Sequence, residues 1–177
     1  LYDGTLLDAQ GNPCHKLMIK APPESTKTSL VRAWLLWVLG REYVEGRDPG
    51  VAYITNADAL SSDQSDAVRR TIEQANHPID EADAYYSLVF PGVELAPDRR
   101  QQITGWSIRK HQRNDDTPTF QAYGRDSHIV GRRFNTAWVL DDLIDAADAA
   151  SQTVKQGINR NYKSVWSLRG KYALLVA

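Results

Sequence analysis

The sequence predicts an α/β fold with a mainly parallel central sheet that is flanked by helices. Two observations lead to this prediction. Short apolar runs at 17–19 and 51–55 have the length and composition of buried strands, and each is followed by a helical pattern, at 28–39 and at about 57–74. Strands that alternate with helices at this pace are joined by crossover connections, so they lie parallel, with helices over both faces of the sheet.

The two helical patterns also predict which side chains face the core. Apolar residues recur at helical spacing in both, and Gly40 is a fitting end for the first helix. The expected inner residues are Leu30, Trp34, Trp37 and Val38 in the first helix, and Leu60, Ala67, Val68 and Ile72 in the second.

The second half of the chain extends the same sheet. Residues 104–109 and 119–123 alternate between apolar and polar side chains, which predicts half-buried strands in an antiparallel or mixed-direction extension. Residues 136–140 are typical of a buried strand, 145–162 of a helix and 172–176 of a final strand.

The composition is that of one globular domain, which we place at 1–177. Hydrophobic residues make up 42% and charged residues 24% of the 177 residues. The formal net charge of -1 means that any contact with DNA has to be local. The single cysteine, Cys14, excludes an internal disulfide, and no apolar run approaches the ~20 residues of a membrane span. Because the chain begins with Leu1 and ends within an apolar run, we expect a fragment of a longer protein.

The loop between the first strand and the first helix has residues suited to binding phosphate. It reads Ala-Pro-Pro-Glu-Ser-Thr-Lys-Thr over 21–28. In a P-loop, backbone N–H groups and the helix N-terminus hold phosphate oxygens, a Lys reaches the β- and γ-phosphates, and the next hydroxyl binds Mg²⁺. The pattern G-x-x-x-x-G-K-[ST] is met in part, since Ala21 and Thr26 stand at its two glycines. The alternative is a well-capped helix, with Ser25 or Thr26 as its N-cap.

The strand at 136–140 runs into two acids, Asp141 and Asp142. Ligands of open α/β sheets bind at the carboxyl ends of the strands, and a nucleotide site needs an acid there for Mg²⁺ and a second one for the attacking water. The alternative is that these acids favour the positive end of the following helix. The order of loop and acids along the chain favours the nucleotide site.

Together these segments resemble the ATPase domain of the large terminase subunit, the DNA-packaging motor of tailed bacteriophages and herpes-type viruses. The resemblance covers most of the chain. It rests on the strand and loop at 16–28, the Val-Phe-Pro segment at 89–91, the loop at 123–133, the strand and acids at 138–145, and the Ala-Ala-Ser segment at 149–151.

The resemblance implies a P-loop ATPase that depends on Mg²⁺. Thr28 and Asp141 would hold the metal ion, and Asp142 would act on the attacking water. Arg132 or Arg133 matches the place of an arginine finger that acts on the neighbouring subunit's nucleotide, and such a finger can be worth ~10³–10⁵ in rate. For either arginine the alternative is a solvated loop or a DNA phosphate contact. The residues implied to bind ATP are Pro23, Glu24, Ser25, Thr26, Lys27 and Thr28, with Lys27 on the β- and γ-phosphates.

The resemblance also implies the setting in which such a domain works. ATP hydrolysis would drive double-stranded DNA into a procapsid, in the cytoplasm of the host cell. The implied partners are DNA, the portal protein, the small terminase subunit and further copies of the chain in a ring, a pentamer in this family, with no membrane partner. The nuclease domain that follows in terminases would lie beyond residue 177.

Two departures from the family pattern leave other functions open. Thr26 replaces the glycine before the lysine, where a side chain crowds the phosphate and a β-branched residue resists positive φ. Leu143 stands where many relatives have Pro. The alternatives are a degenerate P-loop module that binds DNA or partners without hydrolysis, and a P-loop ATPase of helicase type.

Overall fold

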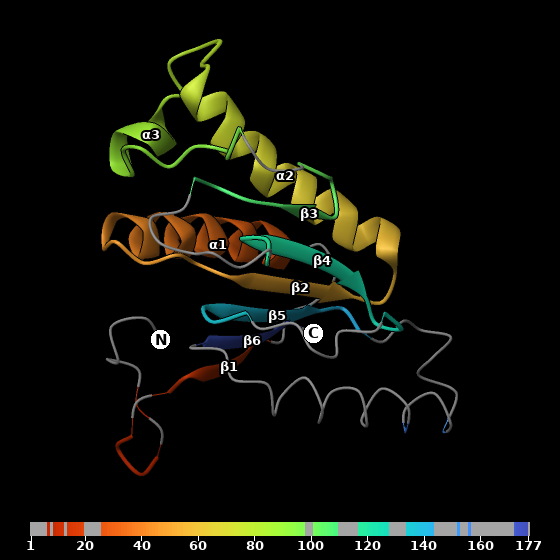
Figure 1. Cartoon of the computed structure of the whole chain (residues 1–177). Helices are drawn as coiled ribbons and strands as arrows, with labels where there is room; N and C mark the ends of the chain where they lie inside the picture. Colours follow the sequence, from red (N-terminus) through yellow and green to blue (C-terminus); the bar gives the residue numbers. More distant parts are fainter. Residues whose placement is uncertain are drawn as a thin grey trace.

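The sheet of this chain has six strands in the order β1-β6-β5-β2-β4-β3 (Figure 1). The computed structural model describes residues 7, 9–12, 14–19, 26–97, 101–109, 117–127, 134–143, 152, 156 and 172–176. All strand pairs are parallel except the edge pair of β3 with β4, which is antiparallel. The predicted α/β class and the antiparallel extension are therefore confirmed. The strands are β1 (Lys16–Ile19), β2 (Val51–Thr55), β3 (Gly105–Trp106), β4 (Phe120–Gly124), β5 (Ala137–Asp141) and β6 (Tyr172–Val176).

Three helices lie in the described part of the chain: α1 (Lys27–Val44), α2 (Asp58–Asn76) and α3 (Tyr85–Val89). α1 and α2 pack on the same face of the sheet, where alternate residues of the central strands, such as Val51, Tyr53 and Val139, join their buried side chains in the main core. The residues between them, including Ile54 and Leu140, form a second cluster on the other face. The helix predicted at 145–162 lies outside the described residues, apart from residues 152 and 156, which are helical.

The first helix runs further than the sequence predicts. Gly40 was expected to end it, but α1 continues to Val44. Gly40 lies inside the helix because the ring of Phe90 packs on it: a Cβ built at Gly40 would stand 2.3 Å from Cγ of Phe90. The expected inward position of Leu30 is wrong, since this side chain is 59% exposed.

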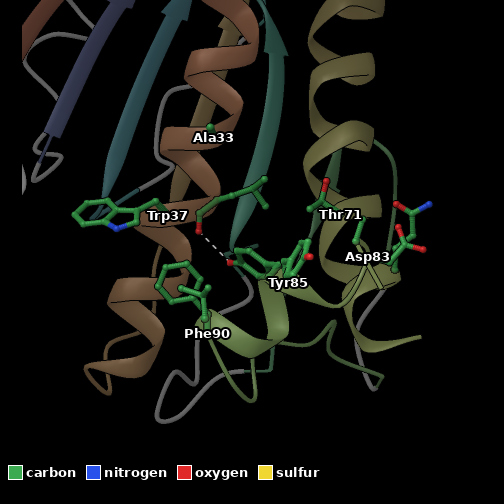
Figure 2. A pocket seen from close by; sticks show the side chains of 11 residues that line it. Ala33, Trp37, Thr71, Asp83, Tyr85 and Phe90 are labelled. Atoms are coloured by element: carbon green, nitrogen blue, oxygen red, sulfur yellow. Dashed lines mark hydrogen bonds between the residues drawn. The ribbon is translucent and has the colours of Figure 1, made fainter. Parts of the chain in front are cut away.

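Trp37 does not belong to the closed core either. Its side chain is partly exposed and lines a groove of 490 Å³ between α1, α2 and α3, whereas Trp34 packs against the core as expected. Figure 2 shows Trp37, Phe90 and Tyr85 around this groove. Tyr85 is the first residue of the short helix α3, which the sequence analysis does not predict.

The inner face of α2 differs in part from the predicted one. Val68 and Ile72 are buried as expected, but Leu60 is 47% exposed. Ser65 is buried instead, and its hydroxyl accepts a hydrogen bond of 3.0 Å from Nε1 of Trp106. A search for apolar periodicity does not find a buried serine that is hydrogen-bonded, and this explains why the inner position of Ser65 was missed.

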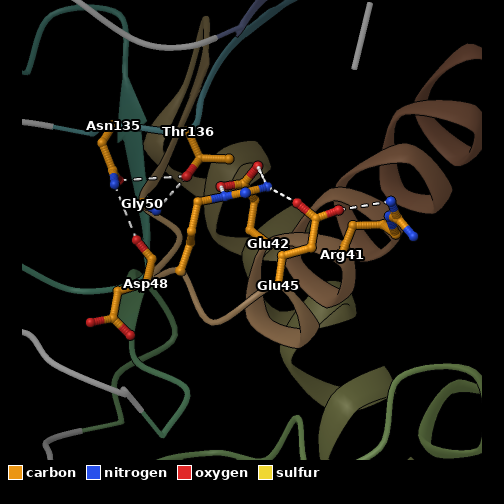
Figure 3. Close-up of polar contacts among 8 residues, drawn as sticks. Arg41, Glu42, Glu45, Asp48, Gly50, Asn135 and Thr136 are labelled. Carbon is orange, nitrogen blue, oxygen red and sulfur yellow. Dashed lines mark hydrogen bonds and ion pairs between the residues drawn. The ribbon is translucent and has the colours of Figure 1, made fainter. Parts of the chain in front are cut away.

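A polar cluster fixes the turn from α1 to β2 (Figure 3). The buried carboxylate of Glu42 accepts two hydrogen bonds from the guanidinium of Arg47, from Nε at 2.7 Å and from Nη2 at 3.0 Å. The backbone N–H of Gly50 donates to Oγ1 of Thr136, at the start of β5. The hydrogen bond between Gly50 and Thr136 joins the amino ends of β2 and β5, at the end of the strands opposite the predicted nucleotide site.

Within the described residues, no helix combines the length and the apolar composition that crossing a membrane requires.

Candidate nucleotide site

The candidate site lies where the carboxyl ends of β1 and β5 face the first turn of α1. β6 stands between the two strands, so their ends are two strand spacings apart, about 9–10 Å. α1 begins at Lys27, and its N-terminus carries backbone N–H groups that have no partner within the helix, together with the positive end of the helix dipole. The sheet and the helix thus bring together residues that are far apart in the sequence.

Lys27 reaches across this gap to Asp142. Its Nζ lies 2.7 Å from Oδ1 of Asp142, a contact between residues 115 positions apart in the sequence. The lysine side chain is 15% exposed and the aspartate side chain 52%, so the pair opens to solvent on the acid's side. A half-exposed ion pair contributes at most about 1 kcal/mol to stability. Its importance is that the predicted lysine and the predicted acid meet.

Asp141, one residue earlier, is buried at the end of β5. Its Oδ2 accepts a hydrogen bond of 2.5 Å from the hydroxyl of Tyr53 on β2. Its Oδ1 is buried as well and receives no hydrogen bond from the described part of the chain. A buried carboxylate oxygen without a donor is expensive unless a cation or another donor supplies the missing contact.

The surroundings of Asp141 both raise and lower the pKa of its carboxyl group. Burial raises the pKa of this carboxyl above its usual range, and the negative charge of Asp142 raises it further. The hydrogen bond from Tyr53, the charge of Lys27 and the hydroxyl of Thr28 lower the pKa. Thr28 therefore lies close enough to Asp141 to favour the charged form, which places the two predicted metal ligands beside each other.

Two residues of the site have left-handed backbone conformations. Thr26, at the N-cap of α1, has a φ of 59° and a ψ of 14°, and Asp142 has a φ of 45°. Asp tolerates this region better than most residues, whereas a β-branched threonine is strained there. Thr26 thus has the conformation for which the P-loop pattern uses glycine.

Several predicted site residues lie outside the described part of the chain. These are Pro23, Glu24 and Ser25 of the loop and the two arginines, Arg132 and Arg133. The loop after β4 is described as far as residue 127. There, Nη1 of Arg125 donates a hydrogen bond of 3.2 Å to the carbonyl of Leu143, directly after the two acids.

Tyr53 is the residue that the sequence analysis missed. The signal was a tyrosine in an otherwise apolar buried strand, because a buried phenol requires a hydrogen-bond partner. The partner could not be read from the sequence, since Asp141 is 88 residues away.

The described residues contain no group of three or more His, Cys, Asp or Glu side chains that could hold a metal ion. A set of ligands made of one hydroxyl, one carboxylate, waters and phosphate oxygens suits Mg²⁺, which usually takes only one or two carboxylates from the protein. The buried Oδ1 of Asp141, which receives no hydrogen bond from the described residues, and the nearby hydroxyl of Thr28 fit such an ion.

Comparison with known proteins assigns no family, because this chain is matched neither by a protein-family model nor by a curated protein.

Proposed function

We propose that this edge of the sheet binds ATP with Mg²⁺ and hydrolyses it. The observation that supports this most directly is the meeting of Lys27 with Asp142 beside Asp141 and Thr28. A cation on a helix N-terminus and two acids at the end of a parallel strand supply complementary charges for a nucleotide phosphate and its metal ion.

Each residue has a separate task in this proposal. The ammonium of Lys27 leaves Asp142 and balances charge on the β- and γ-phosphates. Thr28 and Asp141 hold Mg²⁺, which supplies charge neutralisation on the phosphate oxygens. Once Lys27 has turned to the phosphate, Asp142 is free to accept a hydrogen bond from the attacking water and to orient it in line. The exposed position of Asp142 leaves it open to that water.

The wider role that we propose rests on the resemblance to the large terminase subunit. In that role the chain is the ATPase domain of a motor that moves double-stranded DNA into a procapsid in the host cytoplasm. The proposed partners are DNA, the portal protein, the small terminase subunit and a ring of further copies. Arg132 or Arg133 would then act on the nucleotide of the adjacent copy.

One observation favours a second candidate, a P-loop module that binds partners without hydrolysis. Thr26 has a branched side chain and a left-handed backbone conformation directly before Lys27, at the position where the P-loop pattern has a glycine.

Thermal unfolding with and without Mg-ATP tests the proposed site. A ligand at a hundred times its Kd stabilises the native state by about 2.7 kcal/mol, which is visible as a shift of several degrees in Tm. We expect this shift for the unchanged chain and its loss in Lys27→Ala. Arg70→Ala, which removes an exposed positive charge from α2, is the control and should keep the shift.

Absence of any shift at millimolar Mg-ATP would reject nucleotide binding and favour the second candidate. A shift that persists in Lys27→Ala would place the nucleotide elsewhere on the chain. Where binding is established, turnover is measured next in the assembled ring, because an arginine acting between subunits leaves an isolated copy slow. Duplex unwinding in that assay would favour a helicase over a packaging motor.

A further inference from the structure

We propose that Tyr53 is a positioning residue for the metal ion: its hydroxyl holds Oδ2 of Asp141, so that Oδ1 remains available to the cation. This inference rests on the proposed function and adds a residue from β2 to the site. Tyr53 itself touches neither the metal nor the nucleotide in this arrangement and acts through Asp141.

The strand register explains why these two side chains meet. Tyr53 pairs with Val139 of the neighbouring parallel strand, and Asp141 follows two residues later on the same face of the sheet. Such diagonal neighbours are about 7–8 Å apart, within reach of a tyrosine that leans along the strand. The result is the hydrogen bond of 2.5 Å between the Tyr53 hydroxyl and Oδ2 of Asp141.

The ring of Tyr53 is held in place from the side. It is fully buried and stacks on Phe120 of β4, with the ring centroids 6.2 Å apart and the planes at 22°. Phe120 in turn stacks on Trp106 of β3, at 5.1 Å and 5°. This row of three rings crosses the sheet from its edge toward the site, and it limits the movement of the hydroxyl that holds Asp141.

A neutral donor suits this task better than a cation. A salt bridge to Oδ2 would cancel the charge that Asp141 offers to the metal, whereas a phenol engages one oxygen and leaves the carboxylate negative. The nearby cation Arg32 makes a different contact, since its Nε donates to Oε1 of Gln64 at 2.5 Å.

Tyr53→Phe removes the hydroxyl and keeps the ring, and Tyr86→Phe is the matched control. Tyr86 is partly buried and, like Tyr53, donates a hydrogen bond through its hydroxyl, here to the carbonyl of Leu36 at 3.0 Å, on the side of α1 that lines the groove. We would measure the affinity for ATP in excess chelator, and the affinity for Mn²⁺ by electron paramagnetic resonance in the presence of ATP.

Removing a residue that orients a metal ligand typically lowers the metal affinity by about 10- to 100-fold. We therefore expect Tyr53→Phe to weaken Mn²⁺ binding by about that factor and to leave the affinity for metal-free ATP unchanged. Tyr86→Phe should change neither. Phe120→Leu, which loosens the ring and keeps the hydroxyl, should give a smaller loss of Mn²⁺ affinity and serves as a second variant if Tyr53→Phe does not fold.

An Asp141→Ala background shows whether Tyr53 acts through Asp141. There, Tyr53→Phe should cause no further loss of Mn²⁺ affinity. A further loss, an unchanged Mn²⁺ affinity in the single variant, or an equal loss for metal-free ATP would each overturn the positioning role. If the unchanged chain binds no ATP at all, the proposed function fails, and this role of Tyr53 fails with it.

Discussion

Thr26 is a β-branched residue in a backbone conformation that is unfavourable for it. Its φ of 59° lies in the left-handed region, which costs an L-residue about 1–2 kcal/mol. Glycine adopts this region freely but loses more backbone entropy on folding, which offsets about 0.4–1 kcal/mol of the gain. The balance favours glycine at this position.

We therefore predict that Thr26→Gly stabilises the native state by about 0.5–1 kcal/mol, measured by urea unfolding. It should also bind Mg-ATP at least as tightly as the unchanged chain, because a branched side chain beside the phosphate is removed. Ser29→Gly, three residues on in the first turn of α1, is the control and should lower stability by about 0.5–1 kcal/mol. Equal losses in both variants would mean that Thr26 is not strained.

At the scale of elements, most strands were predictable because they are short segments with little competition from helical patterns. The strand predicted at 104–109 is the exception, since β3 covers only Gly105–Trp106. β2 and β6 begin and end where the sequence predicts, and β5 is displaced by one residue. The candidate site was predictable for a related reason: Asp141 and Asp142 lie at the end of β5, and Lys27 begins the helix that follows β1. What depends on contacts between distant residues was not, such as the burial of Ser65 and the bond from Tyr53 to Asp141.

The length of α1 also depends on a contact between distant residues, the contact of Gly40 with Phe90. Glycine usually marks a helix end, but here the absence of a Cβ makes room for a ring from a segment 50 residues later. Local sequence cannot distinguish these two uses.

We predict that Gly40→Ala destabilises the native state by about 1–3 kcal/mol, although alanine is the better helix former. The reason is that the new methyl group would overlap the ring of Phe90. Urea unfolding measures the effect, and the background Phe90→Ala provides the control. With the ring removed, Gly40→Ala should become neutral or stabilising. The same loss with and without the ring would show that Phe90 is not the cause.

Across the whole molecule, the contact between Lys27 and Asp142 links the first helix to the end of a strand near the far end of the chain. Without a ligand, the acid neutralises the lysine that the proposed phosphate needs. Nucleotide binding then has to replace this pair, so its strength sets part of the affinity. The pair is half exposed, and its contribution of at most about 1 kcal/mol makes the exchange easy.

Removing the competing carboxylate should therefore tighten binding while it stops hydrolysis. We predict that Asp142→Asn lowers the Kd for Mg-ATP by about 2- to 5-fold, the equivalent of a half-exposed ion pair of at most about 1 kcal/mol, and lowers the stability of the ligand-free chain by less than about 1 kcal/mol. Fluorescence titration with an ATP analogue measures the Kd, and ATP turnover in the assembled ring should be lost. Asp126→Asn, which removes an exposed acid from the loop after β4, is the control for net charge and should leave the Kd unchanged. If Asp142→Asn instead weakened binding as much as Lys27→Ala does, the acid would hold the ligand rather than compete with it, and the exchange of partners at Lys27 would be wrong.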